Sequence, residues 1–348
     1  MKKIMVAAIL AALVLMPGCA KKEEAKPALS LYTWEAMFPQ EVLDAFTEET
    51  GYPITYSNFD FDETMLAKLE ASNGGDYDLV IADDYIIEEA VNLGLVSQLD
   101  KSKLSNYGNI NPVYQKPFYD PEDLYTVPYG AGVQTILYNP DKVLLDINGY
   151  KDLWDSTLRD DIGVIANYRV VNGLALKVLG ESYNTDDLDV IQQAGDRLVE
   201  LAPNIRLIKD DNLQDDILSG EVAAIVGYTS MVTMALIENP NLKVVFPEEG
   251  IGFGIMAAFI PSKAPNSEAA YAFLDYIMDP ERGAECFEYL GYYSTYKASD
   301  PFISDEYKSF LTLPEGFATN MEMIQNISAE ANEKHEQIWT LFKNAAGQ

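Results

Sequence analysis

The stretch LSLYTWEAMFPQEVLDAFTEETGYPITYS, residues 29–57, contains the pattern that decides the fold. It begins and ends with a short apolar run, LSLYT and PITYS, each of the length of a buried strand. Between them Val42, Leu43 and Phe46 recur at three- and four-residue spacing, which gives a helix one buried face. Gly51 ends this helix, because glycine adopts the left-handed conformation of a helix C-terminus without strain. The stretch therefore predicts a strand–helix–strand unit.

The same alternation continues along the chain. We predict a helix over 62–72 and a buried strand over 78–82. Two long β-rich runs, 126–140 and 253–261, frame a second alternating set of strands and helices, and after them we expect only helices. One lobe that interrupts another is joined to it by two crossing strands, and a cleft lined by helix N-termini lies between the lobes. The pattern thus predicts an α/β fold of two lobes joined by crossing hinge strands.

The first nineteen residues predict export from the cytoplasm. Lys2 and Lys3 precede an apolar run of thirteen residues, which is too short for the roughly 20 that a membrane-spanning helix needs and is typical of a signal peptide. The small residue before Cys19 resembles the lipobox of bacterial lipoproteins, although Met16 and Pro17 depart from that motif. We expect acylation of Cys19, and a membrane association through this lipid anchor only.

The expected location is the periplasmic or extracytoplasmic face of a bacterial membrane. The charged segment AKKEEAKP after the cysteine cannot bury a core and serves as a tether. The predicted division of the chain is a signal peptide at 1–18, a lipidated tether at 19–28, lobe 1 at 29–134 and 257–305, and lobe 2 at 135–256 and 306–348.

The composition excludes several kinds of function. With 24 Lys and Arg against 55 Asp and Glu, the formal net charge of −31 argues against nucleic acid as a partner. The single histidine, His335, leaves no basis for a His-based zinc site or for Ser-His or Cys-His catalysis. If Cys19 is acylated, Cys286 stands alone and no intrachain disulfide can form. No nucleotide-binding glycine motif is present, so the sequence gives no reason to expect a nucleotide cofactor. Taken together, these features lead us to expect no cofactor, no metal and no enzymatic activity. We also expect a monomer.

Two other classes stay open on these grounds. Acidic residues are plentiful, and a glycosidase needs only a correctly spaced pair of carboxylates. An adhesin or a structural surface lipoprotein would carry the same leader, but it would show no thermal shift with a small ligand.

Several segments together resemble one known family in their order along the chain. They are LYTWEAMFPQEVLDAFTEETG, ETMLAKLEA, GDYDLVIADDYIIEEAVNLGL, QLDKSKLSNYGNINP, DLYTVPYGAG, YKDLW and AAYAFLDYIMDPE. Over about 29–300 the chain resembles the spermidine/putrescine-binding receptors of bacterial ABC importers. The resemblance implies a type II periplasmic-binding-protein fold that closes on a polyamine and delivers it to a permease. Members of this family hold the methylene chain between aromatic rings and each ammonium group with carboxylates.

The aromatic part of that binding pattern is present. Trp34, Tyr85 and Tyr292 match aromatic positions of the family, and Asp83 stands where spermidine receptors have a serine contact. The carboxylate part departs from the pattern. Positions at which the family has acidic or tryptophan side chains carry Asn167, Val170, Gly227 beside Tyr228, Gly254 and Met256. Loss of three charge-assisted contacts would cost roughly 5 to 9 kcal/mol, so spermidine is not expected to bind tightly.

Two ligand classes follow from this departure. The first is a short amine such as putrescine. It would be bound by Glu35, Asp83, Asp84, Trp34 and Tyr85, with cation–π faces from Tyr168, Tyr228 and Tyr292 and with Met256 beside them. The second is a less cationic or anionic solute, toward which Arg169, Asn167 and Gln134 would donate hydrogen bonds.

Overall fold

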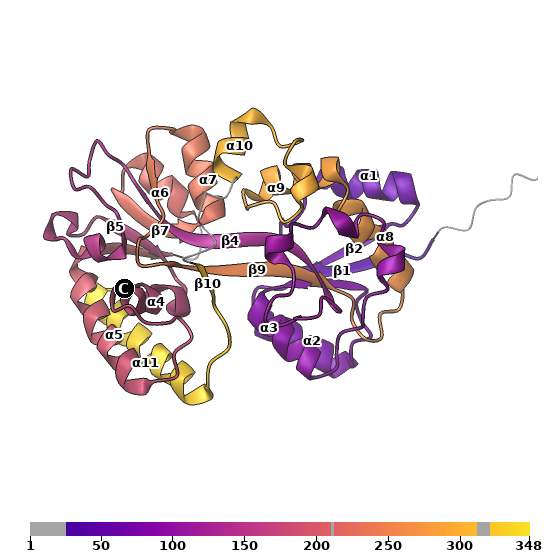
Figure 1. Ribbon diagram of the computed structural model, residues 1–348, viewed down its shortest axis with the longest axis horizontal. Helices are drawn as coiled ribbons and strands as arrows, with labels where there is room; N and C mark the ends of the chain where they lie inside the picture. Colours follow the sequence, from indigo (N-terminus) through magenta and orange to yellow (C-terminus); the bar gives the residue numbers. More distant parts are fainter. Residues whose placement is uncertain (1–25, 210–211, 312–320) are drawn as a thin grey trace, which may run out of the picture.

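A long curved sheet runs through the molecule and joins its two halves (Figure 1). The computed structural model describes residues 26–209, 212–311 and 321–348. The strands follow one another across the sheet in the order β2-β1-β3-β9-β4-β7-β5-β6, while β10 pairs with β9 and β8 pairs with β4. The strands of the first half are β1 (Leu29–Thr33), β2 (Ile54–Asn58) and β3 (Leu79–Ala82). Those of the second half are β5 (Ile162–Ile165), β6 (Ile205–Lys209), β7 (Ala224–Tyr228) and β8 (Lys243–Val245).

Helices cover both faces of each half. The first half, lobe 1, has α1 (Gln40–Thr50), α2 (Asp62–Ser72), α3 (Asp84–Asn92), α8 (Ser267–Ile277) and α9 (Pro280–Leu290). The second half, lobe 2, has α4 (Tyr168–Val178), α5 (Leu188–Leu201), α6 (Leu213–Ser219), α7 (Thr229–Glu238) and the final helix α11 (Ala329–Ala346). A further helix, α10 (Asp305–Leu311), contacts α7. Each lobe therefore has a hydrophobic core on either side of its strands, as the alternating pattern predicts.

Three strands pass between the lobes. β4 (Thr126–Tyr138) pairs antiparallel with β9 (Ile251–Phe259) through its first part and with β7 through its last part. These are the two predicted crossing strands. β10 (Met321–Met323) runs parallel to β9 as a third one, and this corrects the expectation that only helices follow residue 261. β10 was not predicted, because three residues carry too little periodicity to mark a strand.

Two glycines of β4 allow side chains to approach its backbone closely. A Cβ atom at Gly132 would lie 2.8 Å from the ring of Tyr292, and one at Gly130 would lie 2.6 Å from the methyl group of Met256. Larger residues at these positions would displace both side chains from the surface of the crossing strand.

Cys286 is a free, fully buried thiol in the core of lobe 1, where burial raises its pKa to about 12. His335 is also buried, with its Nδ1 3.0 Å from the Nδ2 atom of Asn172, and burial lowers its pKa to about 4. Within the described residues no helix is both long and apolar enough to cross a membrane. Cys19 and the predicted signal peptide lie outside the described residues.

The packing of α11 on α5 offers a test of how lobe 2 is completed. Ile338 is 2% exposed, and its Cδ1 atom lies so close to Gly195 that a Cβ there would be 2.6 Å away. We expect Ile338→Ala to lower the free energy of unfolding by about 2 to 5 kcal/mol, because it opens a cavity in a packed contact. Urea unfolding followed by circular dichroism measures this loss.

Leu341→Ala is the matched control on the same helix, since Leu341 is 56% exposed. We expect it to change stability by no more than about 0.5 kcal/mol. Equal effects of the two substitutions would show that α11 does not contribute its buried face to the core of lobe 2.

Candidate functional site

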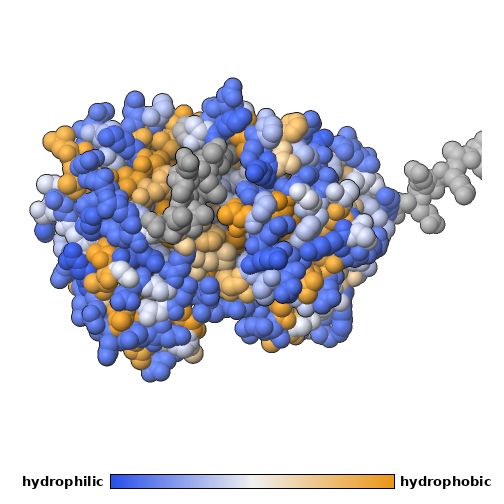
Figure 2. Space-filling view, in the orientation of Figure 1, coloured by the Kyte–Doolittle hydropathy of each residue, from blue (hydrophilic) through white to orange (hydrophobic). Residues whose placement is uncertain are grey.

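A cavity of about 900 Å³ lies between the two lobes, and both lobes and the crossing strands line it. Figure 2 shows the two halves set apart by a notch along the lower edge of the molecule. Nearly all of the predicted ligand-binding residues line this cavity, although they come from distant parts of the chain. They are Trp34, Asp83, Asp84, Tyr85, Gln134, Asn167, Tyr168, Arg169, Tyr228, Met256 and Tyr292.

Glu35 is the exception, and its predicted place in the site is corrected by the structure. Its side chain is exposed and lines a separate, smaller cavity of about 410 Å³ together with Tyr56 and Tyr289. The chain turns directly after it at Ala36, whose φ of 57° is in the left-handed region. Adjacent residues on such a turn point in different directions, so Trp34 faces the main cavity while Glu35 does not.

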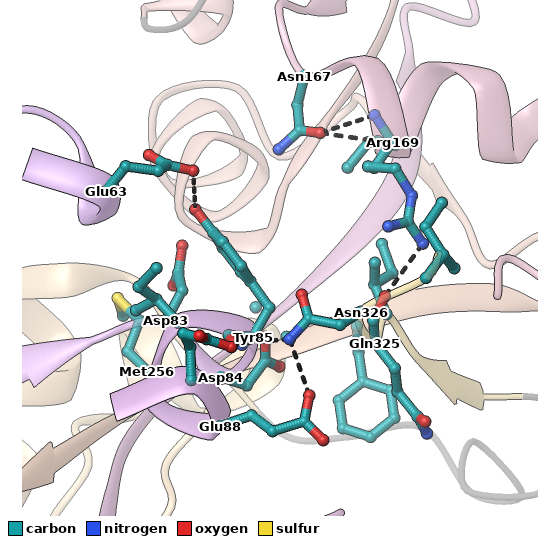
Figure 3. A pocket seen from close by; sticks show the side chains of 18 of the residues that line it. Glu63, Asp83, Asp84, Tyr85, Glu88, Asn167, Arg169, Met256, Gln325 and Asn326 are labelled. Atoms are coloured by element: carbon teal, nitrogen blue, oxygen red, sulfur yellow. Dashed lines mark hydrogen bonds between the residues drawn. The ribbon is translucent and has the colours of Figure 1, made fainter. Parts of the chain in front are cut away.

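Lobe 1 presents a wall of carboxyl groups to the cavity. Asp83 precedes α3 and lines the cavity, whereas Asp62, the first residue of α2, is buried beside it and accepts from its backbone N–H at 3.4 Å. The two helices follow β3 and β2, which are the parallel strands on either side of β1. The hydroxyl of Tyr85 donates to Glu63 at 3.2 Å (Figure 3). Burial raises the pKa of Asp62 to about 9, and the neighbouring Asp83 carboxylate adds to this rise. Burial, with repulsion from Glu63, likewise raises the pKa of Asp83 to about 6.

Asp84 has a structural role in this wall. Its Oδ2 accepts a hydrogen bond from the backbone N–H of Ile255 at 3.0 Å, and its Oδ1 accepts one from the N–H of Tyr85 at 2.8 Å. The residue is 4% exposed and joins the first turn of α3 to the crossing strand β9. Burial and the Asp83 carboxylate hold its pKa well above the ordinary range. The main role of Asp84 is therefore to position α3 against β9, because both of its carboxyl oxygens already accept backbone hydrogen bonds.

The wall of lobe 2 is amide-rich. Asn167 caps α4, since its Oδ1 accepts from the N–H groups of Arg169 and Val170 at 3.1 and 3.2 Å. Its Nδ2 donates to the hydroxyl of Tyr228 at 3.1 Å. An N-cap position favours asparagine. Because the side-chain oxygen of Asn167 caps the helix, it is not available to a ligand.

The guanidinium of Arg169 is engaged within lobe 2. It donates to the carbonyl of Tyr183 at 3.0 Å, to the side chain of Asn184 at 3.4 Å and to the carbonyl of Gln325 at 3.2 Å. Burial lowers its pKa. These contacts hold the segment after β10 against α4, so the main role of Arg169 is structural.

Aromatic rings and one buried amide complete the site. Trp34 packs against Phe59 with ring centroids 5.0 Å apart, and Tyr292 lies over Gly132 of the crossing strand. Gln134 is 3% exposed, and among the described residues its Oε1 has no hydrogen-bond partner. A buried acceptor without a donor favours a ligand that supplies one.

Some cavity residues were not predicted from the sequence. Glu63 could have been found, because the first turns of helices that follow parallel strands of one sheet begin at the same edge of that sheet. The cavity residues that follow β10 could not be predicted, because no sequence pattern marks that segment and β10 itself was not predicted. The unpredicted polar residues of the cavity are Glu63, Glu88, Glu89, Asn92, Gln325, Asn326 and Asn332.

Comparison with known proteins identifies the family of this chain. The family model of the bacterial extracellular solute-binding proteins matches residues 41–329. The chain belongs to the bacterial extracellular solute-binding protein family. This is a family of solute-binding transport proteins and not of enzymes.

Named relatives of this solute-binding protein are polyamine receptors. It is 31% identical over 318 residues to the spermidine/putrescine-binding periplasmic protein of Salmonella typhimurium, covering 90% of this chain and 91% of that protein. It is 28% identical over 348 residues to the putrescine-binding periplasmic protein SpuD of Pseudomonas aeruginosa, covering 94% of each. The resemblance to polyamine receptors of ABC importers is thereby confirmed.

A solved structure shares the whole fold. The spermidine/putrescine ABC transporter substrate-binding protein PotD of Streptococcus pneumoniae, solved in complex with calcium and HEPES, superposes with a TM-score of 0.83 at 29% identity. The match covers 92% of this chain and 100% of that one. The two-lobed periplasmic-binding-protein fold predicted from the sequence is confirmed.

The raised pKa of Asp62 predicts a pH-dependent stability for the unliganded protein. An acid whose pKa is higher in the folded than in the unfolded state destabilises the fold as pH rises between the two values, here from about 4 to about 9. We expect Asp62→Asn, which keeps the shape without the charge, to be more stable than the parent at pH 8 and to show a shallower slope, since Asp83 and Asp84 also have raised pKa values. Urea unfolding of ligand-stripped protein at pH 5, 6.5 and 8 measures it.

Asp60→Asn is the control, because Asp60 is an exposed carboxylate two residues away. It should follow the parent at all three pH values. Parallel pH curves for the parent and Asp62→Asn would contradict the buried, proton-holding role of Asp62.

Proposed function

We propose that this chain is the substrate-binding receptor of a bacterial ABC importer, and that it binds a linear polyamine, putrescine in preference to spermidine, in the interlobe cavity. The observation that carries the proposal is the uncompensated acidic wall of lobe 1. Among the described residues no lysine or arginine forms an ion pair with Asp62, Glu63, Asp83 or Glu88. A cationic ligand would supply the missing charge.

The surroundings of these carboxyl groups suit an alkylammonium ion. Burial disfavours the charged form of a carboxyl group unless a cation lies nearby. The rings of Trp34, Tyr85 and Tyr292 lie around the same cavity and can contribute about 0.5 to 2 kcal/mol each through cation–π contacts. The free Oε1 of Gln134 would accept a hydrogen bond from an amine. Relatives of this chain are named for putrescine binding, which agrees with the proposal.

The unequal charge of the two walls favours a short diamine. A hydrogen bond to a charged group contributes about 1.5 to 3 kcal/mol, and a neutral one about 0.5 to 1.5 kcal/mol. Putrescine can place one ammonium against the lobe 1 carboxylates and the other against amide and hydroxyl groups. Spermidine carries a third charge, for which the lobe 2 wall offers Asn167, Gln325 and Asn332 but no carboxylate among the described cavity residues.

The alternative, a less cationic or anionic solute, depends on free donors in lobe 2. Asn167 already caps α4 and donates to Tyr228, and Arg169 is held by three internal acceptors. These contacts weigh against recognition of an anion. The same proposal includes anchorage through Cys19, delivery to a permease, and function as a monomer.

Calorimetric titration of the chain from residue 20 onward tests the ligand. After unfolding and refolding to remove any carried-over ligand, we expect putrescine to bind with micromolar or tighter affinity, and spermidine at least about tenfold more weakly. Spermine and cadaverine are titrated in parallel. Absence of binding by all four amines would overturn the polyamine assignment and direct the search to less cationic solutes.

Two variants locate the charge that matters in the same experiment. Asp83→Asn should abolish putrescine binding, because it removes the carboxylate that the proposal places at the ammonium. Glu35→Gln removes a carboxylate from the neighbouring segment but outside the cavity, and should bind as the parent does. A merely modest loss in Asp83→Asn would contradict the proposed anchor.

Binding of an amine should also release a proton. Asp62 does not line the cavity, but its carboxyl lies beside Asp83, which does. With a pKa raised to about 9, the unliganded Asp62 holds a proton at pH 7, and an ammonium bound at Asp83 would favour its release. We expect release of up to about one proton per ligand, and an affinity that rises by as much as about tenfold per pH unit between pH 6 and 8. Titrations in buffers of different ionisation enthalpy measure the release.

The groups that face Asp62 in this equilibrium are Glu63, Asp83, Asp84 and Tyr85. Asp62→Asn should show a weaker buffer dependence, with the remainder due to Asp83 and Asp84. Heats that are identical in all buffers for the parent protein would contradict the coupling.

A further inference from the structure

Asn326 bridges the two lobes at the cavity. Its Nδ2 donates to the backbone carbonyl of Tyr85 at 3.0 Å and to Oε2 of Glu88 at 2.8 Å (Figure 3). Both acceptors belong to α3 of lobe 1. Glu88 lies one helical turn after Asp84, so its side chain follows the acidic wall along the same face of the helix.

The segment that carries Asn326 is fixed to lobe 2 on both sides of that residue. Before it, Glu322 forms an ion pair with Lys177 and accepts from the N–H of Tyr183 at 3.1 Å. Arg169, on α4, donates to the carbonyl of Gln325, the residue directly before Asn326.

Further hydrogen bonds complete this attachment. Asn184 donates to the carbonyl of Met323 at 2.8 Å and accepts from the N–H of Gln325 at 2.8 Å. After Asn326, the N–H of Ser328 donates to Asp186 at 2.7 Å. Asn326 is thus a side chain that moves with lobe 2 while its hydrogen-bond acceptors move with lobe 1.

We propose that Asn326 is a latch that holds the lobes closed and so sets how long the ligand stays bound. The inference rests on the proposed closure around a ligand. It adds a positioning residue that need not touch the ligand. One of its acceptors is the carbonyl of Tyr85, whose ring lines the cavity and whose hydroxyl bonds to Glu63. The latch therefore bonds to Tyr85, a residue that lines the cavity and also contacts the acidic wall.

Two features support a latch in preference to a local surface contact. The donor faces one charged and one backbone acceptor, and hydrogen bonds to charged groups are the stronger kind. The segment that carries Asn326 is hydrogen-bonded to α4 and to the loop before α5. Separation of the lobes must therefore break the hydrogen bonds from Asn326 to Tyr85 and to Glu88. Asp84, by contrast, bonds α3 to the crossing strand β9 and does not span the cleft in this way.

Stopped-flow kinetics with putrescine test the latch. We expect Asn326→Ala to release the ligand about 10- to 100-fold faster, with an association rate within about threefold of the parent. Glu88→Ala should act in the same way. The double variant should release the ligand no faster than the stronger single variant, because both substitutions remove one shared contact. Unchanged release, or fully additive effects, would overturn the latch.

Glu89→Gln is the matched control for charge. Glu89 also lines the cavity on the next position of α3, but among the described residues its side chain makes no hydrogen bond. Removing this charge should alter mainly the association rate, through weaker electrostatic attraction. If Glu89→Gln accelerated release as much as Asn326→Ala does, the effect would be one of charge and the latch would be refuted.

A ligand-free measurement separates this inference from the choice of ligand. Spin labels at cysteines introduced at the exposed positions Glu70 on α2 and Glu333 on α11 report the separation of the lobes. Cys286 is buried, and removal of residues before 20 removes Cys19, so labelling is confined to the new sites. In the unliganded protein, Asn326→Ala should shift the distance distribution toward longer separations.

Asn326→Asp is a second variant that keeps the shape of the side chain and places a carboxylate against Glu88. It should widen the lobe separation further. Should putrescine fail to bind, the ligand assignment falls while these distances still decide the latch. Distributions identical to the parent in both variants would overturn it.

Discussion

The antiparallel pairing of β4 with β9 is the constraint on which the rest of the structure depends. It extends from Thr126 opposite Phe259 to Val133 opposite Phe253, with one register shift between Pro128 and Gly130. β9 also pairs with β3 of lobe 1, and β4 continues beyond the pairing to β7 of lobe 2, so backbone hydrogen bonds connect the lobes. The cavity lies beside this ladder because the helices that follow the parallel strands of each lobe begin at the same edge.

The second organising constraint is the separation of charge between the two walls. Asp62 and Asp83 are brought together by the turns after two strands and have no internal cation among the described residues, so burial raises the pKa of both. Across the cavity one terminal nitrogen of Arg169 donates to internal acceptors of lobe 2. The site is therefore poised for a cation at one end and for neutral hydrogen bonding at the other.

Comparison with relatives bears on this difference in charge between the two walls. The chain is 31% identical over 318 residues to a spermidine/putrescine-binding periplasmic protein. Where the sequence resemblance implies lobe 2 carboxylates, Asn167 and Met256 stand instead. The acidic cavity residues that were not predicted, Glu63, Glu88 and Glu89, all come from lobe 1. Family membership describes the fold and transport class, whereas these differences bear on ligand selectivity.

Much of this architecture could be predicted from local sequence. The strand–helix alternation, the crossing runs and the residues after each strand end depend on periodicity and turn chemistry, which neighbouring residues determine. Asp83 and Tyr85, which the resemblance predicts as ligand contacts, line the cavity. Glu35 was misplaced, because one turn at Ala36 redirects its side chain and no periodicity reports such a turn.

Tertiary structure alone decided the rest. The pairing of β10 with β9 depends on where a short segment docks. The hydrogen bonds from Asn326 to Tyr85 and from Arg169 to Gln325 each join residues more than a hundred positions apart. Burial and mutual repulsion, which raise the pKa of Asp62, likewise exist only once two helices meet. Sequence determined which elements form and where charges can gather, because those depend on near neighbours. The fold decided which charges face the ligand, because that depends on distance in space.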